Sequence, residues 1–185
     1  MKSLLRLLAA ALITFGASLH AETPEDVVAR QLAAMRAGDW NKFTACMDIP
    51  ALKEFQASML SVLNAAPAEG PRAQMLKAFF ADQTIPQLTA ATPATFFAAF
   101  MHGLTNSNPI IKQGMASADG QILGHIDEAP DKAHVVMRMS VPVGEGKVTK
   151  MDVTSLRRDG DTWKALLKGD MQAIVANLSK ALQTK

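Results

Sequence analysis

The sequence predicts an α+β domain in which helices pack on one face of a curved antiparallel sheet and a C-terminal helix follows. Up to about residue 104, apolar residues recur at helical spacing behind capping residues. From Gln113 the spacing changes to two, and short turn sequences separate the apolar runs. Because consecutive strands joined by short turns run antiparallel, the sheet is expected to be a meander.

Residues 1–21 are interpreted as a signal peptide. Lys2 and Arg6 give a positive start, the apolar run LLAAALITF is too short to span a bilayer, and Ala21 suits cleavage after it. No cysteine lies near that point for a lipid anchor, and no other stretch is long and apolar enough for an integral membrane segment. We therefore expect a periplasmic or secreted protein in which residues 22–185 form a single domain.

The composition excludes some classes of partner. Two of the 19 basic residues lie in the leader, which leaves 17 basic against 17 acidic residues. Without net charge or a basic stripe, nucleic acid is not expected as a partner. Cys46 is alone and cannot form an internal disulfide, and its apolar neighbours indicate a buried, inert thiol. We expect no cofactor.

The first helix is predicted from its capping residues. Thr23 is the N-cap, Pro24 takes the first helical position, and Asp26 completes a capping box. Gly38 ends this helix, and Asp39 caps a second one that starts in DWNKF. The stretch Gly38-Asp39-Trp40 is therefore interpreted as a bend between two helices and not as a reactive corner.

Further helices complete the first half of the chain. A third helix opens at Pro50, and PAEGPR is a predicted loop. Two more amphipathic helices follow, one in AQMLKAFFAD and one capped by Thr92 and led by Pro93.

Strands are predicted near 118–128, 132–143, 147–158 and 162–168, with a last helix from about Asp170. The inner face, covered by helices, is predicted to carry Ile122, Ile126, Val135, Met137, Met139, Val141, Met151, Val153, Trp163, Ala165 and Leu167. The outer face is predicted to carry His125, Asp127, His134, Arg138, Ser140, Lys150, Asp152, Thr154, Lys164 and Lys168. Placing Trp163 on the inner face requires an odd, three-residue loop around Gly160.

The helical stretch EDVVARQLAAMRAGDWNKFTACMD, followed by strands with AHVVMR and SLRRDGDTWKALL, resembles exported, uncharacterised members of the nuclear transport factor 2-like (SnoaL-like, cystatin-like) superfamily. The matching pieces are the helix break at Gly38-Asp39-Trp40 and the hairpin that ends in Trp163. The chain departs from the simplest members by extra helices at about 67–104. In this superfamily, sheets often pair through the face without helices; since that face is predicted to be charged, we expect a monomer or a weak homodimer.

The resemblance also implies two enzyme templates. Members related to ketosteroid isomerase use a tyrosine, and this chain has none. Members related to limonene epoxide hydrolase use two aspartates bridged by an arginine, which makes Asp127, Arg138 and Asp152, on three successive strands, the catalytic candidates. Ordinary cross-strand ion pairs are the favoured explanation for these three residues.

A ligand pocket is predicted from the methionine and phenylalanine stripes. Met137 and Met139 point the same way on a strand, but no histidine shares their face, so we expect packing and not a metal site. The residues predicted to line the pocket are Phe97, Met101, Met137, Met139, Met151 and Trp163. Simple packing of the helices on each other remains the alternative explanation of these stripes.

The sequence favours a binding domain over an enzyme. The ligand expected for it is a small apolar molecule held between helices and sheet. As an alternative, the helices before the sheet and the final WKALLKGDMQAIVANL resemble toluene-tolerance type phospholipid shuttles, which implies a periplasmic lipid carrier.

Overall fold

The computed structural model describes residues 22–144 and 146–183, so the predicted signal peptide lies outside the described residues. The helices of the first half are α1 (Pro24–Ala37), α2 (Trp40–Ala45), α3 (Ile49–Ala65), α4 (Ala73–Phe80), α5 (Ile85–Ala90), α6 (Pro93–Ser107) and α7 (Pro109–Ala116). The strands β1 (Asp119–Ala129), β2 (Lys132–Val143), β3 (Gly146–Asp159) and β4 (Thr162–Ala165) precede α8 (Gly169–Gln183). The predicted α+β class is confirmed.

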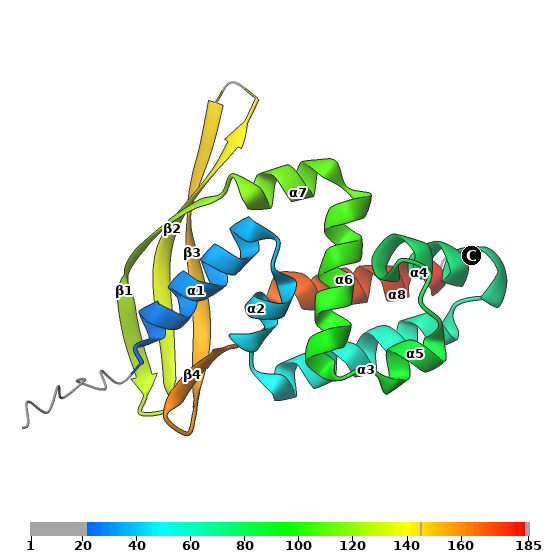
Figure 1. The fold of residues 1–185 in the computed structure, drawn as a ribbon, viewed down its shortest axis with the longest axis horizontal. Coiled ribbons are helices and arrows are strands. Elements are labelled where there is room, and N and C mark those ends of the chain that lie inside the picture. Colours follow the sequence, from blue (N-terminus) through cyan, green and yellow to red (C-terminus); the bar gives the residue numbers. More distant parts are fainter. Residues whose placement is uncertain (1–21, 145, 184–185) are drawn as a thin grey trace, which may run out of the picture.

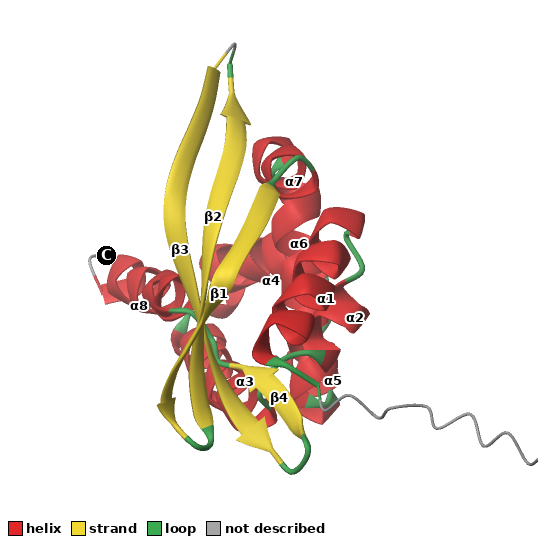
Figure 2. Cartoon of the chain, turned by 90° about the vertical axis from the view of Figure 1, so that its left-hand side faces the viewer, coloured by secondary structure: helices red, strands yellow, loops and turns green. Residues whose placement is uncertain are grey.

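The sheet forms one side of the molecule, and most helices lie beyond one of its faces (Figures 1 and 2). The strands follow the order β1-β2-β3-β4, all antiparallel, which confirms the predicted meander. Helix α1 lies over the sheet, and α2 leads from it to the body formed by α3, α4, α5, α6 and α8. The far ends of β2 and β3 project past the helices (Figure 2).

The predicted helix caps are confirmed. Thr23 and Asp26 form a capping box at the start of α1. Gly38 ends α1 in the left-handed conformation, with φ of 66°. Asp39 then accepts a hydrogen bond from the Lys42 N–H, at 3.0 Å, and so starts α2. These local bonds satisfy backbone groups that a helix end leaves without a partner.

Two hydrophobic clusters build the core. The first joins α3, α4 and α6 through a group of phenylalanines that includes Phe55, Phe80, Phe96 and Phe100. The second packs α1 against the inner face of the sheet, with Val27, Leu32, Val135 and Leu156 among its members. Met35 packs against both clusters, so α1 connects the sheet to the helical body.

The sequence reading missed two short helices. Helix α5 begins with a capping box between Thr84 and Gln87, and α7 begins at Pro109 behind the Asn108 cap. The predicted loop PAEGPR is a kinked turn in which Glu69 and Gly70 leave the helical conformation. The first strand starts at Asp119 because α7 occupies the residues up to Ala116.

The predicted register of β3 is wrong by one residue. Val143 pairs with Gly146, so only two residues separate β2 from β3, and Met137 lies opposite Asp152. Asp152, Thr154 and Lys150 therefore belong to the inner face. Met151 and Val153 lie on the outer face instead, where they are 56% and 48% exposed.

A bulge in β1 reverses the predicted faces beyond Leu123. The pairing shifts between Ile122 and Gly124, where Gly124 takes φ of 142°. His125, opposite Val135, and Asp127, opposite Ala133, consequently belong to the inner face. Ile126 lies on the outer face and is 63% exposed, contrary to the prediction.

The turn between β3 and β4 also differs from the prediction. Asp159 pairs with Thr162 across a two-residue turn with Gly160 at φ of 59°. The turn is one residue shorter than predicted and β3 is shifted by one residue, so the two differences cancel and the faces of β4 are as predicted. Trp163 and Ala165 are buried on the inner face as predicted, at 9% and 0% exposure.

The outer face is less polar than the sequence predicted. His134, Arg138 and Ser140 do face outward. Ile126 and Val153 now add apolar surface beside them. Weak association was predicted from a charged outer face, and that face is in fact partly apolar. The oligomeric state stays a prediction. None of the helices among the described residues has the length and apolar character needed to cross a membrane.

Candidate functional site

A cavity of about 180 Å³ lies between α1, α2, α6 and the inner face of the sheet. Met115 of α7 borders it, as do the segment after β4 and the start of α8. The lining also includes the side chains of Val28, Gln31, Met35, Trp40, Phe43, Met47, Phe97, Met101, Met137, Met139, Asp152, Thr154, Lys168, Asp170 and Met171.

Helix α1 supplies one wall of the cavity. Val28, Gln31 and Met35 follow one another at three- and four-residue spacing, so they share a stripe of the helix. Gly120 of β1 leaves room for side chains beside this wall: a Cβ there would meet Leu32 Cδ1 and Met139 Sδ at 2.9 Å.

Aromatic side chains form a second wall, opposite the sheet. The turn at Gly38 and Asp39 places Trp40, which is 3% exposed, at the start of α2. Its ring meets Phe43 edge to face at 5.6 Å, and Phe43 stacks on Phe97 of α6 at 6.5 Å. The bend at residues 38–40 thus has a role in shaping the pocket.

Seven methionines contribute to the lining, from helices and strands alike. Methionine is unbranched and flexible, and its polarizable sulfur contacts aromatic rings favourably. A wall built from such side chains can adapt to ligands of different shape.

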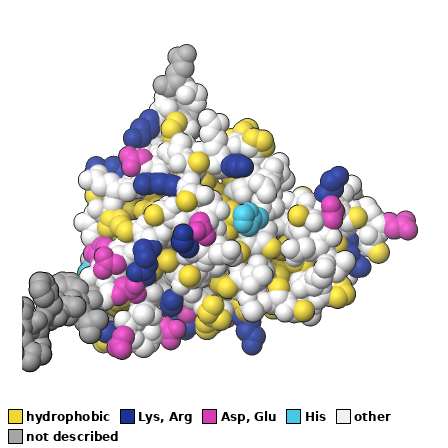
Figure 3. Space-filling view, viewed as in Figure 1, with side chains coloured by type: hydrophobic (Ala, Val, Ile, Leu, Met, Phe, Trp, Pro, Cys, Tyr) yellow, Lys and Arg dark blue, Asp and Glu magenta, His cyan; other side chains and the backbone are white. Residues whose placement is uncertain are grey.

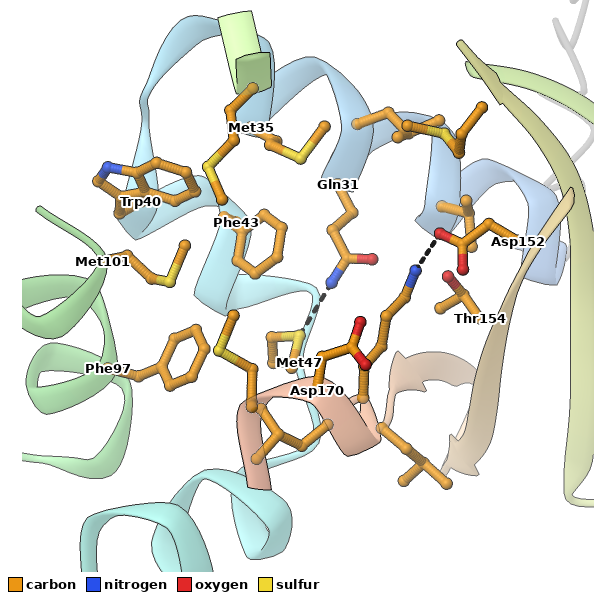
Figure 4. Close-up of a pocket in the computed structure, with 18 of the residues that line it drawn as sticks. Gln31, Met35, Trp40, Phe43, Met47, Phe97, Met101, Asp152, Thr154 and Asp170 are labelled. Carbon is orange, nitrogen blue, oxygen red and sulfur yellow. Dashed lines mark hydrogen bonds and ion pairs between the residues drawn. The ribbon is translucent and has the colours of Figure 1, made fainter. Parts of the chain in front are cut away.

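Polar groups gather where the sheet, α1 and the start of α8 border the cavity (Figure 4). Lys168 Nζ donates to Asp152 Oδ2 at 2.5 Å, and the buried Thr154 lies beside Asp152 on the same face of β3. Asp170, in the first turn of α8, also borders the cavity. Gln31 Nε2 donates to Met47 Sδ at 2.8 Å, so its Oε1 remains as an acceptor.

The structure places four of the six residues predicted for the pocket at the cavity: Phe97, Met101, Met137 and Met139. Met151 does not reach it, because the shifted register turns this side chain to the outer face. Trp163 shares the inner face but lies at the end near residue 22, where its backbone N–H donates to Glu22 Oε2 at 3.2 Å.

The sequence reading missed Gln31, Lys168 and Asp170. Gln31 was detectable, since it lies on the apolar stripe of α1 between Val28 and Met35. Lys168, predicted on the outer face, follows the end of β4 and turns toward Asp152. The sequence contains no local signal for that contact, because it depends on the register of β3.

The three catalytic candidates do not form one site. Asp152 borders the cavity, whereas Arg138 lies on the outer face and donates to Gln121 Oε1 at 3.2 Å. Asp127 lies near the other end of β1, 3.6 Å from His125 Nε2. An arginine bridge would need Arg138 and Asp152 on one face of the sheet, but Arg138 pairs with Met151, and Asp152 pairs with Met137 on the inner face.

Titratable residues at the edge of the sheet lie apart from the cavity. His125 Nδ1 lies 2.5 Å from Glu25 Oε1, and this hydrogen bond raises the pKa of His125. Glu128 interacts with Lys132 and His134, and its hydrogen bond with Lys132 is the main cause of its lowered pKa. On the face shown in Figure 3, basic and acidic side chains are interspersed and form no basic patch.

Cys46 packs with α1 and the sheet and is 5% exposed. Its sulfur lies 3.6 Å from the Lys42 carbonyl oxygen. No group of three or more His, Cys, Asp or Glu residues in 22–144 and 146–183 could hold a metal ion.

Comparisons with known proteins relate the fold to one solved structure. No protein-family model and no curated protein matches the chain. The chain is similar to an NTF-2 like protein of unknown function from Shewanella oneidensis MR-1, solved by crystallography at 1.70 Å. The similarity covers 76% of this chain and 89% of that chain, at 9% identity and a TM-score of 0.40.

Proposed function

We propose that this protein binds a small, largely apolar ligand in the cavity between α1, α2, α6 and the sheet. The observation that carries the proposal is the cavity itself, about 180 Å³ of space lined mainly by methionine and aromatic side chains. Space of this kind inside a core reduces packing, and an apolar ligand that fills it restores those contacts.

The volume indicates the size of the ligand. An apolar cavity of roughly 150 Å³ accommodates benzene, so roughly six to ten non-hydrogen atoms fit here. Burying six methylene groups at about 0.8 kcal/mol each yields about 5 kcal/mol, which corresponds to a dissociation constant on the order of 0.2 mM. Additional atoms at the mouth of the cavity would strengthen binding further.

The lipid-carrier alternative is less well supported. A diacyl phospholipid has two long acyl chains, whose volume far exceeds a cavity of about 180 Å³. Native mass spectrometry of protein purified from its own compartment distinguishes the two ideas. Co-purifying phospholipid would favour the carrier, and we expect none.

We further propose that binding takes place outside the cytoplasm, after residues 1–21 have been removed. The proposal depends on the leader-like sequence described above. N-terminal sequencing of the protein recovered from the periplasm or medium tests it, and Glu22 is expected as the first residue. Protein that retains Met1 and stays in the cytoplasm would contradict it.

The binding proposal is testable through the tryptophans, because Trp40 borders the cavity and Trp163 does not. In a Trp163→Phe variant, the emission reports on Trp40 alone. Titration with hexan-1-ol should shift or quench this emission with saturation in the sub-millimolar to millimolar range. Isothermal calorimetry on the wild-type protein should return the same constant.

A matched pair of substitutions locates the site. Val28 borders the cavity and is 1% exposed, whereas Val153 is 48% exposed on the outer face. Val28→Phe should fill the cavity and abolish hexan-1-ol binding, and Val153→Phe should leave it unchanged. Equal binding by both variants would place the alcohol elsewhere and refute the proposal.

A further inference from the structure

The cavity has an apolar side and a polar side. In Figure 4, Trp40, Phe97 and Met101 lie toward α2 and α6, while Asp152 and Thr154 lie toward the sheet. A ligand that fills such a cavity needs an apolar body and a single polar end. This inference rests on the proposed function and concerns the chemistry of that polar end.

The charges on the polar side favour a cation. Lys168 is the one basic residue among the described side chains that border the cavity, and its ammonium group already contacts Asp152 at 2.5 Å. Asp170 is a second carboxylate there and makes no ion pair within the part of the chain that the structure describes. The amino end of α8 contributes about half a positive charge, which offsets Asp170 only in part.

The hydrogen-bonding groups also match an ammonium ion. Asp152, Asp170 and the Thr154 hydroxyl can all accept hydrogen bonds. Gln31 directs its Oε1, which accepts no hydrogen bond from the residues that the structure describes, toward the side of Asp152 (Figure 4). A primary ammonium group has three donors and no acceptor, so these acceptors can satisfy it in full.

We propose that the ligand of this pocket is a small amphipathic amine. Its hydrocarbon body lies among the methionine and aromatic side chains, and its protonated amino group lies between Asp152 and Asp170. A carboxylate ligand would have to approach two aspartates and compete for a lysine that is already paired.

Three compounds of equal chain length test this inference: hexylamine, hexan-1-ol and hexanoate. Each compound is titrated into residues 22–185 carrying Trp163→Phe, and Trp40 emission is the readout. Calorimetry on the wild-type protein provides a check. We expect hexylamine to bind about tenfold more tightly than hexan-1-ol, and hexanoate to bind most weakly.

Asp170→Asn should weaken hexylamine binding about threefold to fivefold, a larger loss than for hexan-1-ol, because it removes the charge but keeps the shape. Asp161→Asn, in the exposed turn between β3 and β4, is the matched control and should change neither. Urea unfolding of each variant shows that the fold is retained.

The outcomes separate this inference from the proposed function. Equal affinity for hexylamine and hexan-1-ol, insensitive to Asp170→Asn, would overturn the amine and leave the apolar pocket in place. If hexanoate bound more tightly than hexylamine, the amine proposal would be overturned, and an anionic ligand paired with Lys168 would replace it. Binding of none of the three compounds would overturn both proposals.

Discussion

At the scale of single residues, the aspartates that cap α2 and α3 are expected to contribute differently to the stability of the protein. Asp39 caps α2 at the surface, where its pKa is lowered chiefly by the hydrogen bond from the Lys42 backbone. Asp48 caps α3 through Ala51 N–H at 3.0 Å and is 4% exposed. Its other oxygen accepts a hydrogen bond from Arg157 Nη2 of β3 at 2.7 Å, so Asp48 links α3 to the sheet.

Asp48→Ala should therefore destabilise the protein by about 2 kcal/mol, from loss of the cap and of the ion pair with Arg157, whose own side chain is 46% exposed. Asp39→Ala loses a surface cap and a solvent-exposed ion pair with Lys42, and it should cost clearly less. Urea unfolding of both variants measures the difference. If Asp39→Ala were as damaging as Asp48→Ala, the bend at residues 38–40 would need another explanation.

At the scale of elements, the contact between α4 and α6 depends on one glycine. A Cβ on Gly103 of α6 would lie 2.2 Å from the carbonyl carbon and oxygen of Phe79 in α4. Those atoms belong to backbone, so the helices themselves would have to move apart.

Gly103→Ala is accordingly expected to cost about 3 kcal/mol in the free energy of unfolding. Gly114→Ala in α7 is the control, because a Cβ there meets only Val141 Cγ1 at an ordinary 3.9 Å. The control should be neutral or slightly stabilising, since alanine favours helix. Thermal unfolding of both variants provides the comparison, and similar melting temperatures would show that α4 and α6 do not pack as described.

The link between α1 and β1 should depend on pH. His125 has a raised pKa, mainly through its hydrogen bond with Glu25 and with a smaller coulombic contribution from Asp127. A raised pKa in the folded state stabilises the protein fully below the unfolded value of about 6.5, and this contribution disappears as pH rises through the folded value.

The free energy of unfolding lost in His125→Gln should thus be larger at about pH 5.5 than at about pH 8.5, because the contribution of the charged histidine falls as pH rises through its folded-state pKa. Urea unfolding at both pH values measures it. If the free energy of unfolding lost in His125→Gln increased with pH, the interaction with Glu25 could not be its cause.

At the scale of the whole molecule, the outer face of the sheet decides self-association. Its exposed apolar side chains include Ile126, Met151 and Val153, but His134 and Arg138 interrupt them. A stable interface normally buries roughly 1,200–2,000 Å² with a continuous apolar centre. We therefore retain the expectation of a monomer or a weak homodimer.

Sedimentation velocity tests this expectation. We expect monomer at about 1 µM, and any dimer seen at about 100 µM should dissociate in Val153→Lys. Lys53→Ala, at an exposed position of α3, serves as a control on another surface. A dimer that persists at about 1 µM and ignores Val153→Lys would contradict both the weak association and its location.

The sequence by itself determined the α+β class, the meander order and the ends of the main helices. Thr23, Gly38, Asp39 and Thr92 predict these ends because capping acts between residues that are three or four positions apart. The inward direction of Met137 and Met139 followed in the same way from the alternation along one strand.

Only the tertiary structure decided which faces of the other strands meet the helices. Side chains alternate between the two faces of a strand, so a shift of one residue moves each of them to the other face. The bulge at Leu123 and the two-residue turns in place of longer ones cause such shifts. The same pairing brings Asp152 and Lys168 to a cavity lined from α1 at one end of the sequence and α8 at the other. Such a site depends on contacts between residues more than a hundred positions apart, and local spacing contains no information about them.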